Sequence, residues 1–271
     1  MTTAPVVIEA RETTRRVART FAIACRMLPR AMRDDVYVLY LVFRTLDDLV
    51  DHNHPDAVGR IAAVQAWCAG DGVTSREAHL LEQLASRYAL PRHAMHSFCA
   101  GMCQDLAGPC IRSEAELDEY CYRVAGTVGV VMAALLGTHG DPRRADGAAA
   151  ALGMAMQRTN ILRDIDEDRE QGRVYLADDT LERFGGSLAP GGREALMRDQ
   201  IARADALYER GLEGLALLRN GRRAIAAAAA MYREILRQIE REGYGAQAGR
   251  VVVTNRRKMA VAAPAYAMPR S

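Results

Sequence analysis

The segment QRTNILRDIDED, residues 157–168, is the part of this sequence that decides how the rest is interpreted. In a helix that turns about 100° per residue, the polar side chains of this segment share one face. That face consists of Gln157, Asn160, Asp164, Glu167 and Asp168. The isoleucines and the leucine lie on other faces and can be buried. Asp164 and Asp168 are one turn apart and repel each other by about 0.2–0.5 kcal/mol, so the segment predicts a helix that gains from a bound cation.

A second segment, YLVFRTLDDLVD at residues 40–51, has the same design. One helical face carries Tyr40, Arg44, Asp47, Asp48 and Asp51, while valine and leucine side chains cover the opposite face. Two helices that each offer an acid pair can converge on divalent metal, and ligand sets made only of oxygen suit Mg²⁺. The arginines beside the two acid clusters, Arg44 and Arg163, fit phosphoryl oxygens. The two segments together predict a site for Mg²⁺ and a diphosphate substrate.

Two other interpretations of these acids remain open. The acid pairs can belong to a non-catalytic helical scaffold, on which they only face water. They can also serve a Mg²⁺-dependent all-α diphosphate hydrolase, in which bound water attacks the substrate. The recurrence of the pattern on two otherwise apolar helices, each with arginine, tyrosine or amide neighbours, favours a metal site over the scaffold.

The composition indicates one globular domain, residues 1–271, in which residues 1–12 are a loosely held tail. The chain is 49% apolar and 26% charged, and no linker rich in proline, glycine or serine divides it. A net charge of +2 gives no reason to expect nucleic acid as a partner. No apolar run reaches the roughly 18–20 residues that span a bilayer, and the N-terminus lacks a signal-peptide core. The sequence therefore predicts a cytoplasmic protein with no transmembrane segment and peripheral membrane contact at most.

Covalent catalysis finds no support in the pattern of nucleophilic residues. The six cysteines show neither C-x-x-C nor zinc-type spacing, so the simplest expectation is that they are small buried hydrophobes. The sequence also offers no convincing Ser/His/Asp or Cys/His set. The predicted chemistry therefore depends on metal and arginine.

Helix caps and turn residues divide the rest of the chain into helices, and the predicted fold class is all-α. No alternating strand pattern is longer than a few residues. A first helix is expected over residues 13–29, and Asp34 or Asp35 is expected to cap the helix that follows. Two long helices are expected near residues 193–218 and 222–242.

Several shorter features bear on packing. Ser113 and Glu116 form a capping box at the start of one predicted helix. That helix contains Gly126 and Gly129, and glycine costs about 1 kcal/mol in a helix interior. The two glycines fit either a kink that lines a cavity or close packing against a neighbouring helix. The basic segment 250–258 predicts either a last helix or a flexible clamp.

Four motifs in order resemble those of the squalene/phytoene synthase family of trans-prenyltransferases. They are the acid segment 40–51, YCYRVAGTVG at residues 120–129, NILRDIDED at 160–168 and GRVY at 172–175. The resemblance runs from about residue 14 to residue 258. Because the motifs are specific and ordered, the chain is similar to this family rather than to a diphosphate hydrolase.

The resemblance implies a single helical bundle of the isoprenoid synthase type around a deep central cavity, with Mg²⁺ and diphosphate bound at one end. The implied metal ligands are Asp47, Asp48, Asp51, Asn160, Asp164, Glu167 and Asp168. The implied contacts to the diphosphate are Arg44, Gln157, Arg163, Arg173, Tyr175 and Arg250. Phe21, Tyr40 and Tyr122 are implied to line the substrate cavity. The implied catalytic set is Arg44, Tyr40, Tyr122, Asp47, Asp48, Asp51, Asp164 and Asp168.

The reaction that the resemblance implies is the head-to-head joining of two prenyl diphosphates. Metal and arginine stabilise the charge on the departing diphosphate, so that an allylic C–O bond can ionise. An apolar wall then keeps water away from the carbocation until the double bond of the acceptor attacks. This scheme agrees with the chemistry that the acid and arginine clusters predict on their own.

The sequence departs from the family pattern at several positions. A Ser-x-Ser-Phe motif reads ARTF at residues 18–21, and Ala22 stands where a bulky residue is frequent. Arg158 replaces an apolar residue, and Ala177 replaces a proline. These changes leave the ionising half intact and affect how the second substrate is held. The alternative is therefore the same donor chemistry with transfer to an aromatic acceptor, such as a carbazole in secondary metabolism. Prenyl chain length, product, NADPH requirement and oligomeric state stay open.

Overall fold

The computed structural model describes residues 4–108 and 110–268, and within these ranges every regular element is a helix. In chain order, the α-helices are α1 (Ala4–Val17), α2 (Arg19–Cys25), α3 (Arg30–Asp51), α4 (Ala57–Ala69), α5 (Arg76–Ala85), α6 (Arg92–Ala107), α7 (Glu114–Cys121), α8 (Thr127–Leu136), α9 (Pro142–Glu170), α10 (Asp178–Arg183), α11 (Glu194–Glu213), α12 (Arg222–Arg241) and α13 (Asn255–Ala267). A π-helix, η1 (Tyr122–Gly126), joins α7 to α8, and a 3₁₀-helix, η2 (Gly214–Leu217), follows α11. The all-α prediction is confirmed.

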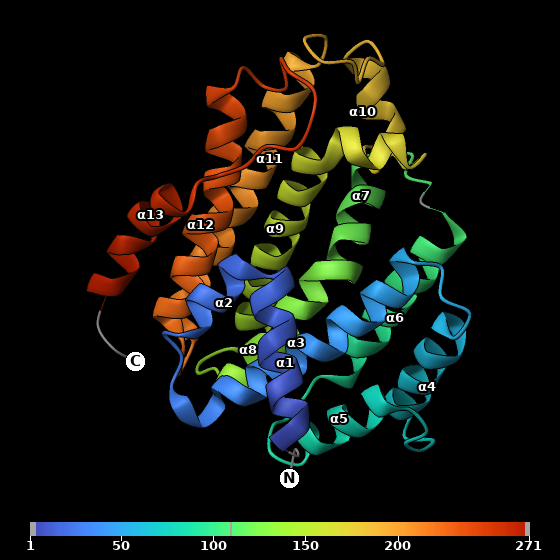
Figure 1. The fold of residues 1–271 in the computed structure, drawn as a ribbon, viewed down its shortest axis with the longest axis vertical. Helices are drawn as coiled ribbons and strands as arrows, with labels where there is room; N and C mark the ends of the chain where they lie inside the picture. Colours follow the sequence, from blue (N-terminus) through green and yellow to red (C-terminus); the bar gives the residue numbers. More distant parts are fainter. Residues whose placement is uncertain (1–3, 109, 269–271) are drawn as a thin grey trace.

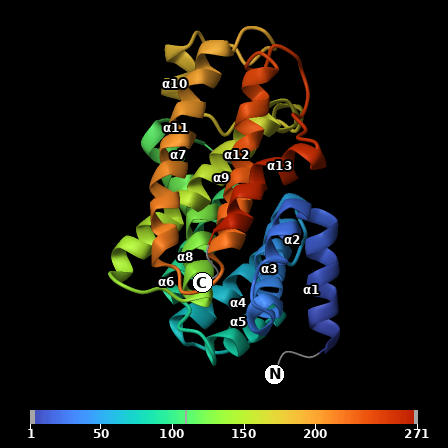
Figure 2. The same cartoon turned by 90° about the vertical axis from the view of Figure 1, so that its left-hand side faces the viewer.

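Helix α9 lies at the centre of the bundle (Figure 1). It packs against α7, α8, α11 and α12. It contributes buried residues to two apolar cores, one built around α3 and α8 and the other around α11. Helix α12 also contacts α2 and α13, and these elements lie on the same side of the molecule (Figure 2). The segment that carries the second acid motif is therefore held from several directions.

The glycines of the π-helix and α8 serve close helix packing. A Cβ atom on Gly129 would lie 2.2 Å from the carbonyl oxygen of Ala149 on α9. A Cβ atom on Gly153 of α9 would lie 2.2 Å from the carbonyl oxygen of Ala125. The two backbones thus touch directly, which only glycine permits. Of the two alternatives, close packing is therefore confirmed. The same stretch also departs from regular α-helix as a π-helix, a distortion that is frequent at functional sites.

The expected loose tail at residues 1–12 is wrong for the described residues. Helix α1 begins at Ala4, and its Ala10 is fully buried against the core. Arg11 pairs with Asp34 of α3 at 2.7 Å. The helix forms because α3 offers a partner for its apolar face, a tertiary contact that local sequence does not show.

The cap predicted for α3 is also wrong. The helix begins at Arg30, directly after Pro29, instead of near residue 34 or 35. Asp35 is buried and accepts hydrogen bonds from Arg87 and from the Tyr88 hydroxyl at 2.8 and 2.7 Å. Its carboxylate therefore fastens α3 to the end of α5 and does not cap a helix.

The capping box at α7 is confirmed in one half. The Ser113 hydroxyl accepts a hydrogen bond from the Glu116 backbone N–H at 3.3 Å. The Glu116 carboxylate reaches one residue further back than expected and accepts from the Arg112 N–H at 2.6 Å. The two predicted long helices correspond to α11 and α12, and the basic segment 250–258 divides into an extended part and the start of α13.

One helical segment meets the length and composition of a membrane span, although no such segment was expected. Residues 114–136, which comprise α7, η1 and α8, are long and apolar enough by composition to cross a membrane. Of the most apolar 18-residue window in this segment, 56% is buried inside the bundle. Core helices meet the same test, so the segment is weak evidence for a membrane span.

The cysteines only partly match the expectation of burial. Cys25, Cys99 and Cys121 are buried, whereas Cys103 and Cys110 are exposed. Burial raises the pKa of the Cys25, Cys99 and Cys121 thiols to about 12. These three thiols are therefore poor nucleophiles at neutral pH.

Candidate active site

The end of the first acid-rich helix lies beside the segment that follows the second. Asp51 closes α3, and its Oδ1 lies 3.4 Å from Nη1 of Arg173, which follows α9. The acid motif of each helix occupies its C-terminal part. The structure therefore brings together segments that are more than a hundred residues apart in sequence.

Arg44 holds the first acid cluster together on α3. Its Nη1 donates to Asp47 at 2.9 Å, and its Nη2 donates to Asp48. The Asp47 side chain is 43% exposed. Burial, followed by the negative charge of Asp51, raises the pKa of Asp47 to about 7. The cluster therefore carries more negative potential than one arginine neutralises, which favours a further cation.

The second acid cluster, on α9, is paired with two arginines. Arg163 donates to both oxygens of Asp164, at 2.8 and 2.5 Å. Arg250 approaches from the segment before α13, with its Nε 3.3 Å from Asp164 and its Nη1 3.0 Å from Glu167. Burial, followed by the charge of Asp164, raises the pKa of Asp168 to about 6. Arg250 therefore lies beside the cluster of Arg163, Asp164, Glu167 and Asp168. Sequence spacing alone could not place Arg250 there.

The amide of Asn160 provides the test of whether these residues fit a metal ion. Its Nδ2 donates to Gln157 Oε1 at 3.3 Å, while its buried Oδ1 has no hydrogen-bond donor among the described residues. A buried carbonyl oxygen without a partner costs about 1–3 kcal/mol. It is also a ligand that Mg²⁺ accepts. These oxygen donors therefore suit Mg²⁺. Among the described residues, no three side chains of His, Cys, Asp or Glu lie close enough together to hold a metal ion without movement.

Asp105, on α6, joins the site although the sequence did not single it out. The Tyr120 hydroxyl donates to Asp105 Oδ1 at 3.0 Å, and the Tyr120 ring stacks on that of Tyr175 with centroids 5.3 Å apart. Burial raises the pKa of Asp105 to about 6. The hydrogen bond from Tyr120 opposes this rise, and the negative charge of Asp51 adds to it. The sequence held one signal for this role. Asp105 follows the apolar Met102 by three residues, so the two share one helical face, and that face is buried at Met102.

Lys258 is a second residue that the sequence did not assign to the site. Its Nζ donates to the Thr20 hydroxyl at 3.1 Å. Burial, followed by the positive charges of Arg163 and Arg19, lowers its pKa. In the sequence Lys258 was only one member of a basic run, whereas in the structure it brings α13 next to α2 and to the arginine of the second acid motif.

Aromatic side chains begin the apolar part of the site. The rings of Phe21 on α2 and Tyr40 on α3 lie 5.3 Å apart, and burial raises the Tyr40 pKa. Tyr122 lies on the π-helix, where a Cβ atom on Gly126 would approach its ring to 2.9 Å. Tyr122 packs against the core around α3 and α8. That it lines the substrate cavity stays a prediction.

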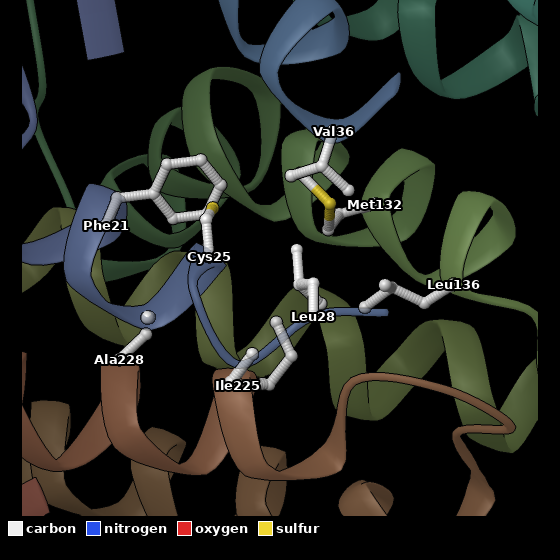
Figure 3. Close-up of a pocket in the computed structure, with 10 residues that line it drawn as sticks. Phe21, Cys25, Leu28, Val36, Met132, Leu136, Ile225 and Ala228 are labelled. Atoms are coloured by element: carbon white, nitrogen blue, oxygen red, sulfur yellow. The ribbon is translucent and has the colours of Figure 1, made fainter. Parts of the chain in front are cut away.

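An apolar pocket lies between α2, α3, α8 and α12 (Figure 3). Its lining residues are Phe21, Ala24, Cys25, Leu28, Val36, Met132, Leu136, Ala224, Ile225 and Ala228. The pocket has a volume of about 10 Å³, roughly the space of one water molecule. The deep cavity that the resemblance implies is therefore narrow here, and side chains must move to admit a prenyl chain.

Arg158 lies outside the site, which corrects the interpretation that it affects the second substrate. Its side chain is 3% exposed and pairs with Glu114 and Asp118, both at 2.8 Å. It also donates to Gln200 at 2.9 Å. These partners belong to α7 and α11. A charge at an apolar position is tolerated because it is fully paired, and it joins three helices.

An all-α bundle that brings two acid-rich helices together at one end has the isoprenoid synthase architecture. A sequence model of the squalene/phytoene synthase family matches residues 14–257 of this chain. Phytoene synthase of Thermus thermophilus is 38% identical over 239 residues, which cover 83% of this chain and 80% of that protein. A crystal structure of a dehydrosqualene synthase matches with a TM-score of 0.87 at 26% identity, over 97% of this chain and 96% of that one. This chain therefore belongs to the squalene/phytoene synthase family and is a prenyltransferase.

Proposed function

We propose that this enzyme ionises an allylic prenyl diphosphate with the help of Mg²⁺ and joins it head to head to a second prenyl diphosphate. The observation that carries the proposal is the meeting of two acid clusters, with their arginines, at one end of an apolar bundle. Two relatives support the same reaction class. One is the phytoene synthase described above, and the other is the presqualene diphosphate synthase of Zymomonas mobilis, 38% identical over 172 residues that cover 61% of this chain and 58% of that protein.

The residues that would hold the metal are Asp47, Asp48, Asp51, Asn160, Asp164, Glu167 and Asp168. When bound, Mg²⁺ supplies positive charge that stabilises the departing diphosphate. Arg44, Arg163 and Arg250 lie beside these ligands and present several N–H groups toward the same end of the bundle. A guanidinium group binds two phosphoryl oxygens in a fork, so the arginines orient the diphosphate and disperse its charge.

The aromatic and aliphatic residues next to the acid end protect the cation that ionisation produces. The rings of Phe21 and Tyr40 offer negative faces that stabilise a carbocation without reacting with it. The pocket that Phe21 borders is otherwise lined by aliphatic side chains, the Cys25 thiol and Met132. Exclusion of water from such a wall favours attack by the second prenyl chain over hydrolysis.

Transfer to an aromatic acceptor gains no support from the described residues. The departure at Arg158 is explained by ion pairs with α7. Ala22 is 8% exposed and packs within the bundle, and Thr20 bonds to Lys258. Head-to-head joining therefore remains the favoured reaction.

The test is a product assay with purified enzyme, Mg²⁺ and one prenyl diphosphate at a time, from dimethylallyl to geranylgeranyl. The expected product is a hydrocarbon or cyclopropyl diphosphate with twice the number of carbons. Release of prenol alone would identify a hydrolase. Diphosphate binding without any joined product would instead point to a different acceptor.

Two variants complete this assay. Asp47→Asn and Asp164→Asn each remove a charge from one acid motif, and each is expected to lower the Mg²⁺-dependent rate by about a hundredfold or more. Asp205→Asn, which removes a carboxylate paired with Arg233 between α11 and α12, is the matched control and should retain activity. Equal activity in all three variants would exclude the proposed metal site.

A further inference from the structure

Helix α9 carries a buried acid that neither the metal nor the diphosphate needs. Asp166 lies between the acids of the second motif in sequence, and it points about 200° around the helix from Asp164. Its side chain is 7% exposed, and Arg193, just before α11, is 4% exposed. Arg193 donates two hydrogen bonds to Asp166, Nη1 to Oδ1 and Nη2 to Oδ2, each 2.7 Å long. This two-pronged geometry makes the pair strong and directional.

The same ion pair holds the segment 243–254, which joins α12 to α13 and is named the strap here. The backbone N–H of Gly249 donates to Asp166 Oδ2 at 2.9 Å. Arg193 Nη2 donates to the carbonyl oxygen of Gln247 at 3.4 Å. The strap backbone is therefore fixed to a side chain on the back of α9.

Glycines allow the strap to pass this close. A Cβ atom on Gly245 would lie 2.4 Å from Nε of Arg193, so the strap crosses directly over the guanidinium group. The N–H of Gly191, in the loop before α11, donates to the Gly245 carbonyl oxygen at 3.1 Å. Gly245 and Gly249 have φ angles of +81° and +103°, which other residues rarely adopt.

The residue that follows the anchored peptide is Arg250. Its side chain reaches Asp164 and Glu167 on the front of α9, at 3.3 and 3.0 Å. The Arg250 side chain is 45% exposed, and exposed ion pairs contribute little order of their own. The position of its backbone, set at Gly249, therefore decides what its guanidinium group can reach.

We propose that Asp166 and Arg193 form a latch that positions Arg250 over the second acid motif for binding of diphosphate. The inference rests on the proposed function, because it assumes that Arg250 has a diphosphate to bind. One helix then supplies metal ligands from its front face and, from its back, the anchor for a cation that completes the site. Asp166 and Arg193 are positioning residues and do not touch substrate.

The first arm of the test is hydrogen exchange of the strap in the full-length protein without ligand. Asp166→Asn removes the charge but keeps the shape, and it is expected to speed amide exchange in residues 243–254 about tenfold. Asp205→Asn, which removes a carboxylate of α11 that pairs with two arginines of α12, is the control and should leave the strap unchanged. Unchanged strap exchange in Asp166→Asn would overturn the latch.

The second arm measures binding of inorganic diphosphate with Mg²⁺ by calorimetry. Arg250→Gln and Asp166→Asn are each expected to weaken binding by about tenfold or more. The double variant should bind no more weakly than Arg250→Gln alone, because the latch acts only through Arg250. Additive losses would contradict the proposal. A wild-type protein that binds no diphosphate would refute the proposed function, while the exchange arm would still decide on the latch.

A paired substitution covers the case in which Asp166→Asn does not fold. Asp166→Leu with Arg193→Met replaces the buried ion pair by apolar side chains of similar size, which proteins often tolerate without loss of stability. It leaves the Gly249 N–H without its acceptor. We expect fast strap exchange and weak diphosphate binding at normal thermal stability. Tight binding in this variant would show that the strap needs no latch.

Discussion

At the scale of single residues, the environment of each carboxyl group determines whether it favours a proton or an arginine. Burial outweighs the Tyr120 hydrogen bond at Asp105 and raises its pKa to about 6. At Asp166 the hydrogen bonds from Arg193 outweigh burial and lower the pKa. The first carboxyl faces the acid end of the bundle, where a cation is expected, and the second faces a permanent cation. The opposite pKa shifts therefore follow from whether the neighbour of a buried carboxyl group is another acid or an arginine.

Asn160→Leu is expected to separate stability from binding. Leucine has a similar size and removes the buried Oδ1 that has no donor among the described residues. Stability should stay constant or rise by about 1 kcal/mol, since an unpaired acceptor is lost together with one weak hydrogen bond to Gln157. Binding of Mg²⁺ and diphosphate should fall at least about tenfold. Thermal unfolding and calorimetry measure the two effects, and a parallel loss of both would contradict a metal-binding role.

Asp105→Asn is expected to stabilise the protein at neutral pH. The folded-state pKa of Asp105, about 6, lies above its ordinary value of 3.8. Between these two values the folded state binds more protons than the unfolded state, so stability falls as the pH rises through this window. The variant removes this penalty, which corresponds to about 1–3 kcal/mol at pH 7. Urea unfolding at pH 4 and pH 7 tests this: the gain should be present at pH 7 and nearly absent at pH 4.

At the scale of helices, the sequence correctly predicted the features that depend on neighbouring residues in the chain. The 3.6-residue period placed both acid stripes on helices, and the family motifs placed the arginines beside them. The start of α1, the role of Asp35 and the direction of Arg158 depend on partners from distant segments, so local sequence could not reveal them. The same holds for the contact between Asp105 and Tyr120, which joins α6 to α7. The strap is the extreme case, because Asp166 and Gly249 meet across 83 residues.

Helix α13 is expected to depend on pH through Glu234 of α12. Glu234 is 5% exposed and accepts from Arg241 at 2.6 Å and from Arg257 of α13 at 2.7 Å. Burial raises its pKa, but the hydrogen bonds from Arg257 and Arg241 outweigh it, and the pKa lies below its ordinary value of 4.5. The stabilisation is therefore complete above pH 4.5 and lost as the pH falls through the folded-state pKa.

Glu234→Gln tests this contact. The substitution should cost about 1–2 kcal/mol at pH 7, because both arginines remain partly solvated. The stability difference from wild type should shrink below about pH 4.5. Thermal unfolding across pH 3–7 measures this trend. A difference that is independent of pH would show that Glu234 contributes by packing and not by charge.

At the scale of the whole molecule, α3 connects two ends of opposite character. Asp47 follows Val36 by eleven residues, which corresponds to about 16 Å along a helix. Asp47 belongs to the acid cluster, and Val36 lines the apolar pocket (Figure 3). A substrate with a charged head and a hydrocarbon tail matches this separation. The pocket is small, so its walls are expected to set how long the tail can be.

Substitutions at the pocket are expected to change substrate length without affecting the diphosphate end. Met132→Ala enlarges the pocket and should shift the preferred prenyl diphosphate toward longer chains, whereas Ala228→Leu fills it and should lower kcat/KM about tenfold or more for the longest accepted chain. Met197→Ala is the matched control, because Met197 is 1% exposed in the core around α11 and does not line the pocket. Both methionine variants should lose about 2–5 kcal/mol of stability. The measurement is the product profile of each variant with each prenyl diphosphate. If Met132→Ala and Met197→Ala both shift the preferred chain length, then lost stability, and not pocket size, determines that length.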